Sequence, residues 1–406
     1  MLGLITTTVS AQTYTVLIKG GTVIDPKNNL NEVMDVGIFE GKIKKIAKNI
    51  APSESRQVVD AKGMYVTPGL IDIHGHVFAG TQQDHYLSDG FVALPPDGFT
   101  FRVGVTTIVD CGGAGWTNFS TFKKNIIFNS KTRVLSFLNI VGEGMRGGAY
   151  EQDTSDMDPK MAAAIAVKNK NDIVGFKVAH FQGRDWKPVD NAVAAGKLAN
   201  MPVIVDFGGS TPPLSLEELF MKHLRPGDIF THTYTLLPGD IRETVVDEST
   251  GKVKPFVLAA RKRGIVFDVG YGGASFNYSQ AIPALKVGFY PSTISTDLHT
   301  GSMNGSMKDM LSIMSKFYVM GMDLPSVIKA STWGPAQVIK RENLGHLSEN
   351  GIADVAIFSM RNGNFGFYDK TGYKMEGKQK LECEMTIMGG KIVYDLNGIA
   401  KPIYPR

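Results

Sequence analysis

Short apolar segments alternate with segments of helical spacing through the middle of the chain. Fully apolar strands separated by helices are typical of a parallel sheet that is covered on its faces. Eight such units in about 280 residues fit the length of a TIM-type (β/α)8 barrel. We therefore predict an α/β fold in which residues 67–347 form this barrel. The eight predicted strands are residues 69–73, 105–109, 134–140, 173–178, 203–205, 229–231, 265–269 and 293–295.

The two ends of the chain carry strand patterns of another kind. Residues 14–25 alternate β-branched and other residues around a Gly20-Gly21 pair, and residues 386–395 repeat that arrangement around Gly389-Gly390. Such glycine pairs are typical of hairpins and bulges. Because the two ends resemble each other and differ from the middle, we predict that residues 14–66 and 348–406 together form one small β-sandwich domain.

Residues 1–13 precede these patterns. The first eleven carry no charged side chain and end in Val9-Ser10-Ala11, which is typical of the end of a secretory signal, but the basic start of such a signal is missing. A signal-peptide remnant and a disordered start both stay open, and the pattern favours a periplasmic or exported protein over a cytoplasmic one. No apolar segment reaches the roughly 18 residues of a membrane span, so no membrane contact is expected.

Composition narrows the class of protein. Of the 406 residues, 43% are hydrophobic and 20% are charged, a globular profile that excludes disordered, collagen-like and coiled-coil chains. The 43 basic and 39 acidic residues give a net charge of +4 and are spread along the chain, so we expect no nucleic-acid partner. Cys111 and Cys383 are too few for a disulfide framework or a thiolate zinc site. A homo-oligomer stays open.

Polar side chains gather where the predicted barrel strands end. In a (β/α)8 barrel the active site lies at the carboxyl ends of the strands. Five of the eight histidines fall at these positions, together with one lysine, two aspartates and one tyrosine. In chain order they are His74, His76, Lys177, His180, Asp206, His232, Tyr271, Asp297 and His299.

His74 and His76 carry the strongest metal signal. They lie two residues apart on one strand, so their side chains project to the same face. A third imidazole, His232, and the carboxylate of Asp297 complete a set that suits Zn²⁺ or a similar cation.

Lys177 lies in an otherwise apolar strand, where a bare ammonium would be costly to bury. Its amine either reaches the rim of the barrel or reacts with CO2 to form an anionic carbamate that bridges two metals, and the spacing leaves both open.

The segment Pro68-Gly-Leu-Ile-Asp-Ile-His-Gly-His76, followed by Lys177, His232 and Asp297, resembles the amidohydrolase superfamily. The similarity is greatest to its dihydroorotase-like amidohydrolase/deacetylase branch and covers nearly the whole chain. The resemblance implies two divalent ions, with zinc first and Mn²⁺ or Fe²⁺ as alternatives. His74, His76 and Asp297 would then hold the more buried ion. A CO2-derived carbamate on Lys177 would bridge it to a second ion, which His232 would also bind.

One position departs from that pattern. The resemblance implies a histidine at the end of the fifth strand, but the chain has Asp206 there. We favour direct metal ligation by this carboxylate, which makes Mn²⁺ or Fe²⁺ more competitive with Zn²⁺. It would cancel the formal charge of a two-ion site, whereas a histidine would leave one positive charge. Alternatively, Asp206 orients His180 or His232 without touching the metal, and His180 fills the ligand position.

Four further residues are candidates for contact with the substrate. Tyr271 lies between glycines after the seventh strand, where its phenol either donates to a developing oxyanion or lines the pocket. Arg146, in a glycine-rich segment beyond the third strand, either binds a substrate carboxylate or lies on the surface. His180 and His299 lie beside the predicted ligands, and we expect both to contact the substrate.

These residues predict metal-assisted hydrolysis of an amide, a cyclic amide or an ester bond in a small molecule. A hydroxide that bridges the two ions attacks the carbonyl, and Asp297 carries a proton from this nucleophile to the leaving group. Two alternatives stay open. One is a mononuclear deaminase of a nucleobase-like ring, against which Lys177 and Asp206 argue. The other is a barrel with an eroded site that serves as an assembly scaffold.

Overall fold

In the computed structural model, which describes residues 12–206, 209–239 and 241–405, the middle of the chain forms a parallel barrel. Its seven strands are β6 (Leu70–Gly75), β8 (Val105–Gly115), β9 (Arg133–Asn139), β10 (Ile173–Val178), β11 (Val203–Val205), β12 (Ile229–Phe230) and β15 (Val266–Phe267). They lie side by side in chain order. Residues 293–298 take the eighth position, because Thr293 pairs with Asp268 and Leu298 pairs with Gly75. The predicted (β/α)8 barrel is therefore confirmed.

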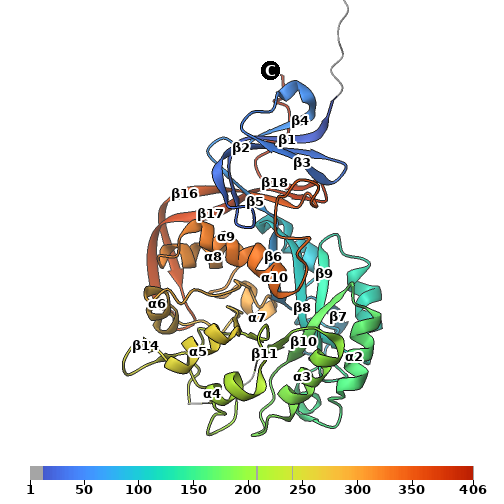
Figure 1. The fold of residues 1–406 in the computed structure, drawn as a ribbon, viewed down its shortest axis with the longest axis vertical. Coiled ribbons are helices and arrows are strands. Elements are labelled where there is room, and N and C mark those ends of the chain that lie inside the picture. The colour runs from blue at the N-terminus through green and yellow to red at the C-terminus, as the bar shows by residue number, and fades with distance from the viewer. Residues whose placement is uncertain (1–11, 207–208, 240, 406) are drawn as a thin grey trace, which may run out of the picture.

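Helices surround the barrel. They are α1 (Phe119–Phe122), α2 (Pro159–Lys168), α3 (Lys187–Ala199), α4 (Leu216–Glu218), α5 (Pro255–Arg263), α6 (Tyr278–Lys286), α7 (Thr300–Met303), α8 (Met310–Val319), α9 (Leu324–Ser331) and α10 (Trp333–Val338). The Asp158 side chain accepts hydrogen bonds from the first turn of α2, and Gly264 ends α5 with a φ of 100°. Both α2 and α3 contact β10 and lie on the outside of the barrel (Figure 1).

Strands from both termini form a second sheet. They are β1 (Tyr14–Asp25), β2 (Leu30–Phe39), β3 (Lys42–Ala47), β4 (Ser55–Asp60), β5 (Tyr65–Pro68), β16 (Val355–Tyr368), β17 (Lys374–Met388) and β18 (Lys391–Asp395). Antiparallel pairing of β5 with β16 joins the two parts into one sheet, which lies above the barrel in Figure 1. The predicted β structure built from both termini is thus confirmed, and its domain boundaries stay a prediction.

The two longest strands, β16 and β17, extend beyond the terminal sheet. They continue along the side of the barrel, next to α8 and toward α6 (Figure 1). The backbone N–H of Leu381 donates to the hydroxyl of Ser315 in α8, and the hydroxyl of Tyr278 in α6 donates to the carbonyl of Phe367. This hairpin therefore ties the terminal sheet to the helical layer. Three short strands, β7 (Ala79–Gln82), β13 (Val246–Asp247) and β14 (Lys252–Val253), lie in connecting loops.

The barrel interior is filled with apolar side chains. Buried strand residues pack there against residues of α10 and of the segment that follows it. This cluster contains Ile71, Ile73, Val109, Cys111, Leu135, Phe137, Val174, Ile204, Ile229, Ala336, Ile339 and Leu344. Because the interior is packed, polar side chains of the strands can reach a ligand only at the carboxyl end of the barrel.

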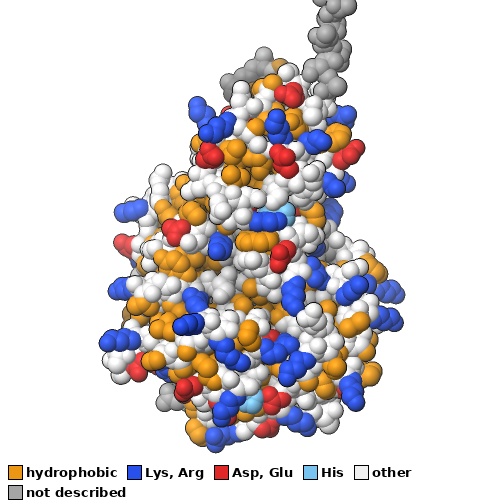
Figure 2. Space-filling model, in the orientation of Figure 1, with side chains coloured by type: hydrophobic (Ala, Val, Ile, Leu, Met, Phe, Trp, Pro, Cys, Tyr) orange, Lys and Arg blue, Asp and Glu red, His pale blue; other side chains and the backbone are white. Residues whose placement is uncertain are grey.

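The helices and the surface charges bear on the predictions about membranes and nucleic acids. Among the described residues, no helix is long and apolar enough to cross a bilayer. On the face shown in Figure 2, Lys and Arg side chains lie scattered, with Asp and Glu between them. The expectation of export depends on residues 1–11, which lie outside the described residues.

The Arg133–Asp354 ion pair, at 2.5 Å, links β9 to the start of β16 and gives a test of stability. Asp354 is buried and also accepts the backbone N–H of Gly389. We expect Asp354→Ala to lower the free energy of unfolding by about 2–3 kcal/mol, measured by urea denaturation, because it removes the counter-ion of Arg133 and leaves the backbone N–H of Gly389 without its acceptor. Arg361→Ala, which breaks an exposed pair with Glu382, should cost less than about 1 kcal/mol. If both variants lost the same free energy of unfolding, the Arg133–Asp354 pair would not be a special link between β9 and β16.

Candidate metal centre

Three buried side chains converge at the carboxyl end of the barrel. His74 lies on β6, His76 follows that strand, and Asp297 lies on the eighth barrel segment. Nε2 of His76 is 2.9 Å from Oδ1 of Asp297, and Nε2 of His74 is 3.6 Å from the same oxygen. The ligand atoms of the three residues all lie within 4.8 Å of one another, so a single metal ion can contact them together.

Hydrogen bonds determine which nitrogen His74 turns toward this point. Its Nδ1 lies 2.9 Å from Oγ1 of Thr231, and that hydroxyl donates to Asp268 at 2.7 Å. Nδ1 therefore carries its own proton, and Nε2 presents a lone pair. Burial, together with the charge of Lys177, lowers the pKa of His74 to about 4, and burial lowers the pKa of His76 to about 3. Both rings are neutral at pH 7, as metal ligation requires.

A second pair of ligand atoms lies beside the first set. Nδ1 of His232 donates to the carbonyl of Gly270 at 2.5 Å, so in the neutral form of this ring the lone pair lies on Nε2. That Nε2 lies 3.2 Å from Oδ2 of Asp206. The ring centroids of His74 and His232 are 5.1 Å apart. Because two acceptors at such a distance repel unless a proton or a cation lies between them, this donor set fits a bound cation.

Lys177 reaches the same group from β10. It is only 1% exposed, and its Nζ lies 3.5 Å from Nε2 of His74. Burial lowers the pKa of Lys177, but Cys111 and the carboxylates of Asp206 and Asp297 raise it above its ordinary value. The structure therefore buries this amine next to His74 of the first set, where the charge of Asp206 also acts on it, and the alternative in which it reaches the rim of the barrel is wrong.

Gly270 leaves room for two of the imidazoles. Its φ of 46° lies in the left-handed region that favours glycine. A Cβ atom there would lie 2.3 Å from Oγ1 of Thr231, 2.9 Å from Nδ1 of His232 and 3.0 Å from Nδ1 of His74. Any side chain at this position would displace the groups that orient the rings.

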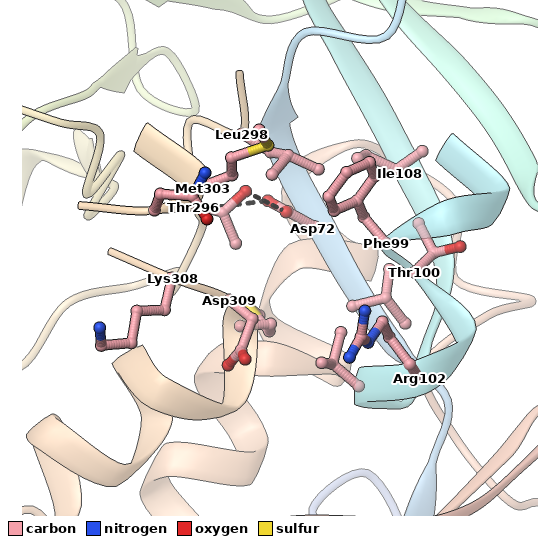
Figure 3. A pocket seen from close by; sticks show the side chains of 14 residues that line it. Asp72, Phe99, Thr100, Arg102, Ile108, Thr296, Leu298, Met303, Lys308 and Asp309 are labelled. Atoms are coloured by element: carbon pink, nitrogen blue, oxygen red, sulfur yellow. Dashed lines mark hydrogen bonds between the residues drawn. The ribbon is translucent and has the colours of Figure 1, made fainter. Parts of the chain in front are cut away.

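Asp72 holds the backbone of two predicted ligands in place. Its carboxylate accepts the backbone N–H groups of His74 and Thr296, and it accepts the Thr296 hydroxyl at 2.5 Å. Figure 3 shows Asp72 and Thr296 in the wall of a cavity of about 320 Å³, which Arg102 also lines. Since Thr296 precedes Asp297, one buried carboxylate connects the first and eighth positions of the barrel.

Asp206 pairs with a buried arginine. Nη1 of Arg242 lies 3.1 Å from Oδ1 of Asp206, and Nη2 donates to the carbonyl of Thr231 at 2.8 Å. Burial would raise the pKa of Asp206, but His232, Lys177 and Arg242 outweigh it and hold the pKa well below its usual range. The carboxylate is therefore ionised at neutral pH.

His180 lies where the centre meets an open cavity of about 960 Å³. Its Nδ1 lies 2.7 Å from Oε2 of Glu151, and its Nε2 lies 3.8 Å from Oδ2 of Asp206. Burial lowers the pKa of His180, but Glu151 and Asp206 raise it above its ordinary value. His299 stays close to the first set, since its Nδ1 donates to the carbonyl of Asp297 at 2.8 Å. Contact of either histidine with substrate stays a prediction.

Arg146 also lines this cavity. Its guanidinium lies 4.1 Å from the centroid of the Tyr150 ring, and it lies 3.5 Å from Glu143 and 3.6 Å from Asp84. The structure thus places Arg146 at the mouth, where two carboxylates already surround its charge. Its role in substrate binding stays a prediction.

The phenol of Tyr271 does not face the centre. Its hydroxyl lies 2.6 Å from Nζ of Lys316 in α8 and donates to the carbonyl of Tyr368 in β16, and its ring stacks on Phe276. The residue is fully buried, and burial raises the pKa of its phenol far above the usual range. The prediction that Tyr271 donates to an oxyanion or lines the pocket is wrong, because the chain turns this side chain outward into the helical layer.

Two residues of the centre have weak sequence signals or none. Asp268 interrupts an apolar segment, which indicates a buried carboxylate with fixed partners, and it accepts hydrogen bonds from Thr231, Thr293 and Ser295. Arg242 lies in a loop whose sequence shows no periodicity, so only the folded chain reveals its contact with Asp206.

Comparison with known proteins assigns the chain to a family. No family model matches it. A curated deacetylase of Brucella anthropi is 32% identical over 363 residues, which cover 87% of this chain and 86% of that protein. Solved structures of an adenine deaminase and a dihydroorotase are each 28% identical in sequence to this chain, and each alignment covers 94% of it. The adenine deaminase is covered over 100% of its own chain with a TM-score of 0.83, and the dihydroorotase over 99% with a TM-score of 0.81. The chain therefore belongs to the amidohydrolase superfamily of metal-dependent hydrolases, in the deacetylase and dihydroorotase branch that acts on carbon–nitrogen bonds other than peptide bonds.

Proposed function

We propose that this protein hydrolyses an amide, a cyclic amide or an ester bond of a small molecule with the help of two divalent ions. The observation that carries this proposal is the convergence of His74, His76 and Asp297, whose ligand atoms lie within 4.8 Å of one another. His232 and Asp206 support it, because they present a second pair of acceptor atoms beside the first set.

The ligand roles follow from the donor atoms. His74, His76 and Asp297 would hold one ion, and His232 and Asp206 would hold the other. Atoms bound to one tetrahedral zinc lie about 3.3 Å apart, given bonds of about 2.0–2.1 Å, and the 3.2 Å between His232 and Asp206 fits this spacing. Zinc suits the imidazoles, and the two carboxylates make Mn²⁺ and Fe²⁺ competitive. In this proposal Asp206 is a direct ligand.

Lys177 is the proposed bridge between the two ions. A carbamate formed from CO2 would convert its buried amine into an anion with two oxygen donors, one for each ion. His74 Nε2, 3.5 Å from the amine, shows how close this side chain lies to the first set.

The reaction divides between ions and side chains. Bound divalent ions would polarise the scissile carbonyl and lower the pKa of the attacking water. Asp297 would accept the proton of that water and transfer it to the leaving group. The cavity at the mouth would hold the rest of a small-molecule substrate, with Arg146, His180 and His299 as candidate contacts.

A deaminase is the second candidate, because one of the similar solved structures is that of an adenine deaminase. The dihydroorotase structure has the same 28% sequence identity to this chain, so the similarity does not distinguish the two reactions. The buried Lys177 and the carboxylate of Asp206 favour the two-ion hydrolase, because they supply anionic bridging and second-ion ligands that a one-ion site does not need.

Metal content and a substrate screen test the proposal together. We expect about two ions per chain after purification in buffer with zinc and bicarbonate, and turnover of a compound among N-acyl amino acids, O-acyl hydroxy acids or hydantoin-like rings. Mass spectrometry of the metals and product assays give the result. Ammonia release from a nucleobase would favour the deaminase, and a chain that binds no metal would favour a scaffold.

Asp297→Asn tests the proposed proton transfer. The amide keeps one oxygen for the ion but accepts no proton, so kcat should fall by about 10²–10⁴-fold while the metal content stays unchanged. Steady-state kinetics and metal analysis on the same sample measure both quantities. A kcat near that of the unchanged protein would exclude Asp297 as the proton carrier.

Gly270→Ala tests the packing around the rings, with Gly288→Ala as its matched control. Both positions have positive φ, at 46° and 73°, so each alanine should cost about 1–2 kcal/mol of stability. Of these two positions, only Gly270 has groups that the added Cβ meets, since no described residue comes within 4 Å of a Cβ at Gly288. We expect only Gly270→Ala to weaken metal binding, by at least about 10-fold in a chelator competition. The same loss in both variants would assign the effect to the backbone alone.

A further inference from the structure

Arg242 is a buried cation with one carboxylate partner. It is 6% exposed and lies among groups that offer it little solvation, with its guanidinium 4.9 Å from the centroid of the Phe230 ring. Among the described residues, Asp206 is the only carboxylate that forms an ion pair with it, and its Nε has no hydrogen-bond partner. A buried charge of this kind needs its counter-ion, so Arg242 and Asp206 act as a unit.

The contacts of Arg242 determine which oxygen Asp206 offers. Nη1 holds Oδ1 at 3.1 Å, while Nη2 is anchored to the carbonyl of Thr231, the residue before His232. Oδ2 is then left facing Nε2 of His232 at 3.2 Å and Nε2 of His180 at 3.8 Å. The carboxylate is therefore presented with one oxygen toward the cation site and the other toward the guanidinium.

The charge balance of the site also couples Arg242 to Asp206. Asp206 adds a negative charge to a site that also contains Asp297 and, in the proposed function, an anionic Lys177 carbamate. The positive charge of Arg242 cancels that addition within hydrogen-bond distance. The Asp206–Arg242 pair is then electrostatically equivalent to one neutral ligand, such as an imidazole.

We propose that Arg242 is a positioning residue of the metal centre, which pins Asp206 through Oδ1, turns Oδ2 toward His232, and makes the pair a neutral ligand for the second ion. This inference rests on the proposed function, because it assigns Asp206 to that ion. It predicts that the arginine becomes unnecessary when position 206 carries a ligand that is neutral by itself.

Four proteins test the inference: the unchanged chain, Arg242→Met, Asp206→His, and the double variant with both changes. Each is purified with zinc and bicarbonate, and zinc per chain and zinc affinity are measured by mass spectrometry and chelator competition. We expect Arg242→Met to bind the second ion about 10–100-fold more weakly. Asp206→His alone should also weaken it, because Arg242 then lies unpaired beside the ions. The double variant should recover affinity above both single variants, which a purely structural role of Arg242 would not produce.

Arg261→Met is the matched control. Arg261 likewise donates to a backbone carbonyl and packs 3.9 Å from a phenylalanine ring, but it lies outside the centre. We expect the Arg261→Met variant to bind both ions as the unchanged chain does. Binding of both ions by Arg242→Met as in the unchanged chain would overturn the inference, as would a folded double variant no better than Asp206→His. If Arg242→Met does not fold, two other comparisons decide. The first is between Asp206→His and the double variant. The second uses Arg242→Lys, which keeps the positive charge but lacks the planar guanidinium that donates to two acceptors. An unchanged chain without zinc would instead refute the proposed function.

Discussion

Unshared electron pairs of imidazoles and carboxylates face one another in a buried space at the carboxyl end of the barrel, and the other features of the site depend on this. Nε2 of His232 and Oδ2 of Asp206 are 3.2 Å apart, and Nε2 of His76 and Oδ1 of Asp297 are 2.9 Å apart. Such groups lose their hydration on burial and repel one another. A divalent cation reverses both terms, because each lone pair then becomes a ligand. The same arrangement that is unfavourable without a cation therefore favours binding one.

The surroundings keep these electron pairs aimed inward. Thr231 and Asp268 fix the tautomer of His74, and the carbonyl of Gly270 does so for His232. Asp72 joins the backbones of the two barrel positions that hold the first set. The proposed ligands and these partners lie on or next to barrel strands, whereas Arg146 lies on a loop beyond β9. Chemistry and substrate choice can therefore change independently in this fold.

Particular residues show how far sequence reasoning extends. His74 and His76 could be recognised because alternation on a strand places both side chains on one face, and Lys177 because an ammonium stands out in an apolar strand. The prediction for Tyr271 used only its position at the end of a strand. Such a position does not determine which way the chain turns there, so the predicted orientation of this side chain is wrong. In the structure its ring lies against Phe276, away from the centre. Predicted strand boundaries also differ from the observed ones, since β8 continues six residues beyond the predicted end at residue 109 and β15 has only two residues.

The sequence by itself determined the (β/α)8 class, the sheet built from both termini and the order of the residues that gather at the mouth. These depend on periodicity and on position within a repeated unit, which are local properties of the chain. Only the tertiary structure decided which oxygen of Asp206 points inward, which nitrogen of each histidine is free, and that Arg242 compensates a buried charge. Those are relations between segments far apart in sequence, and packing and long-range electrostatics settle them after the chain has folded.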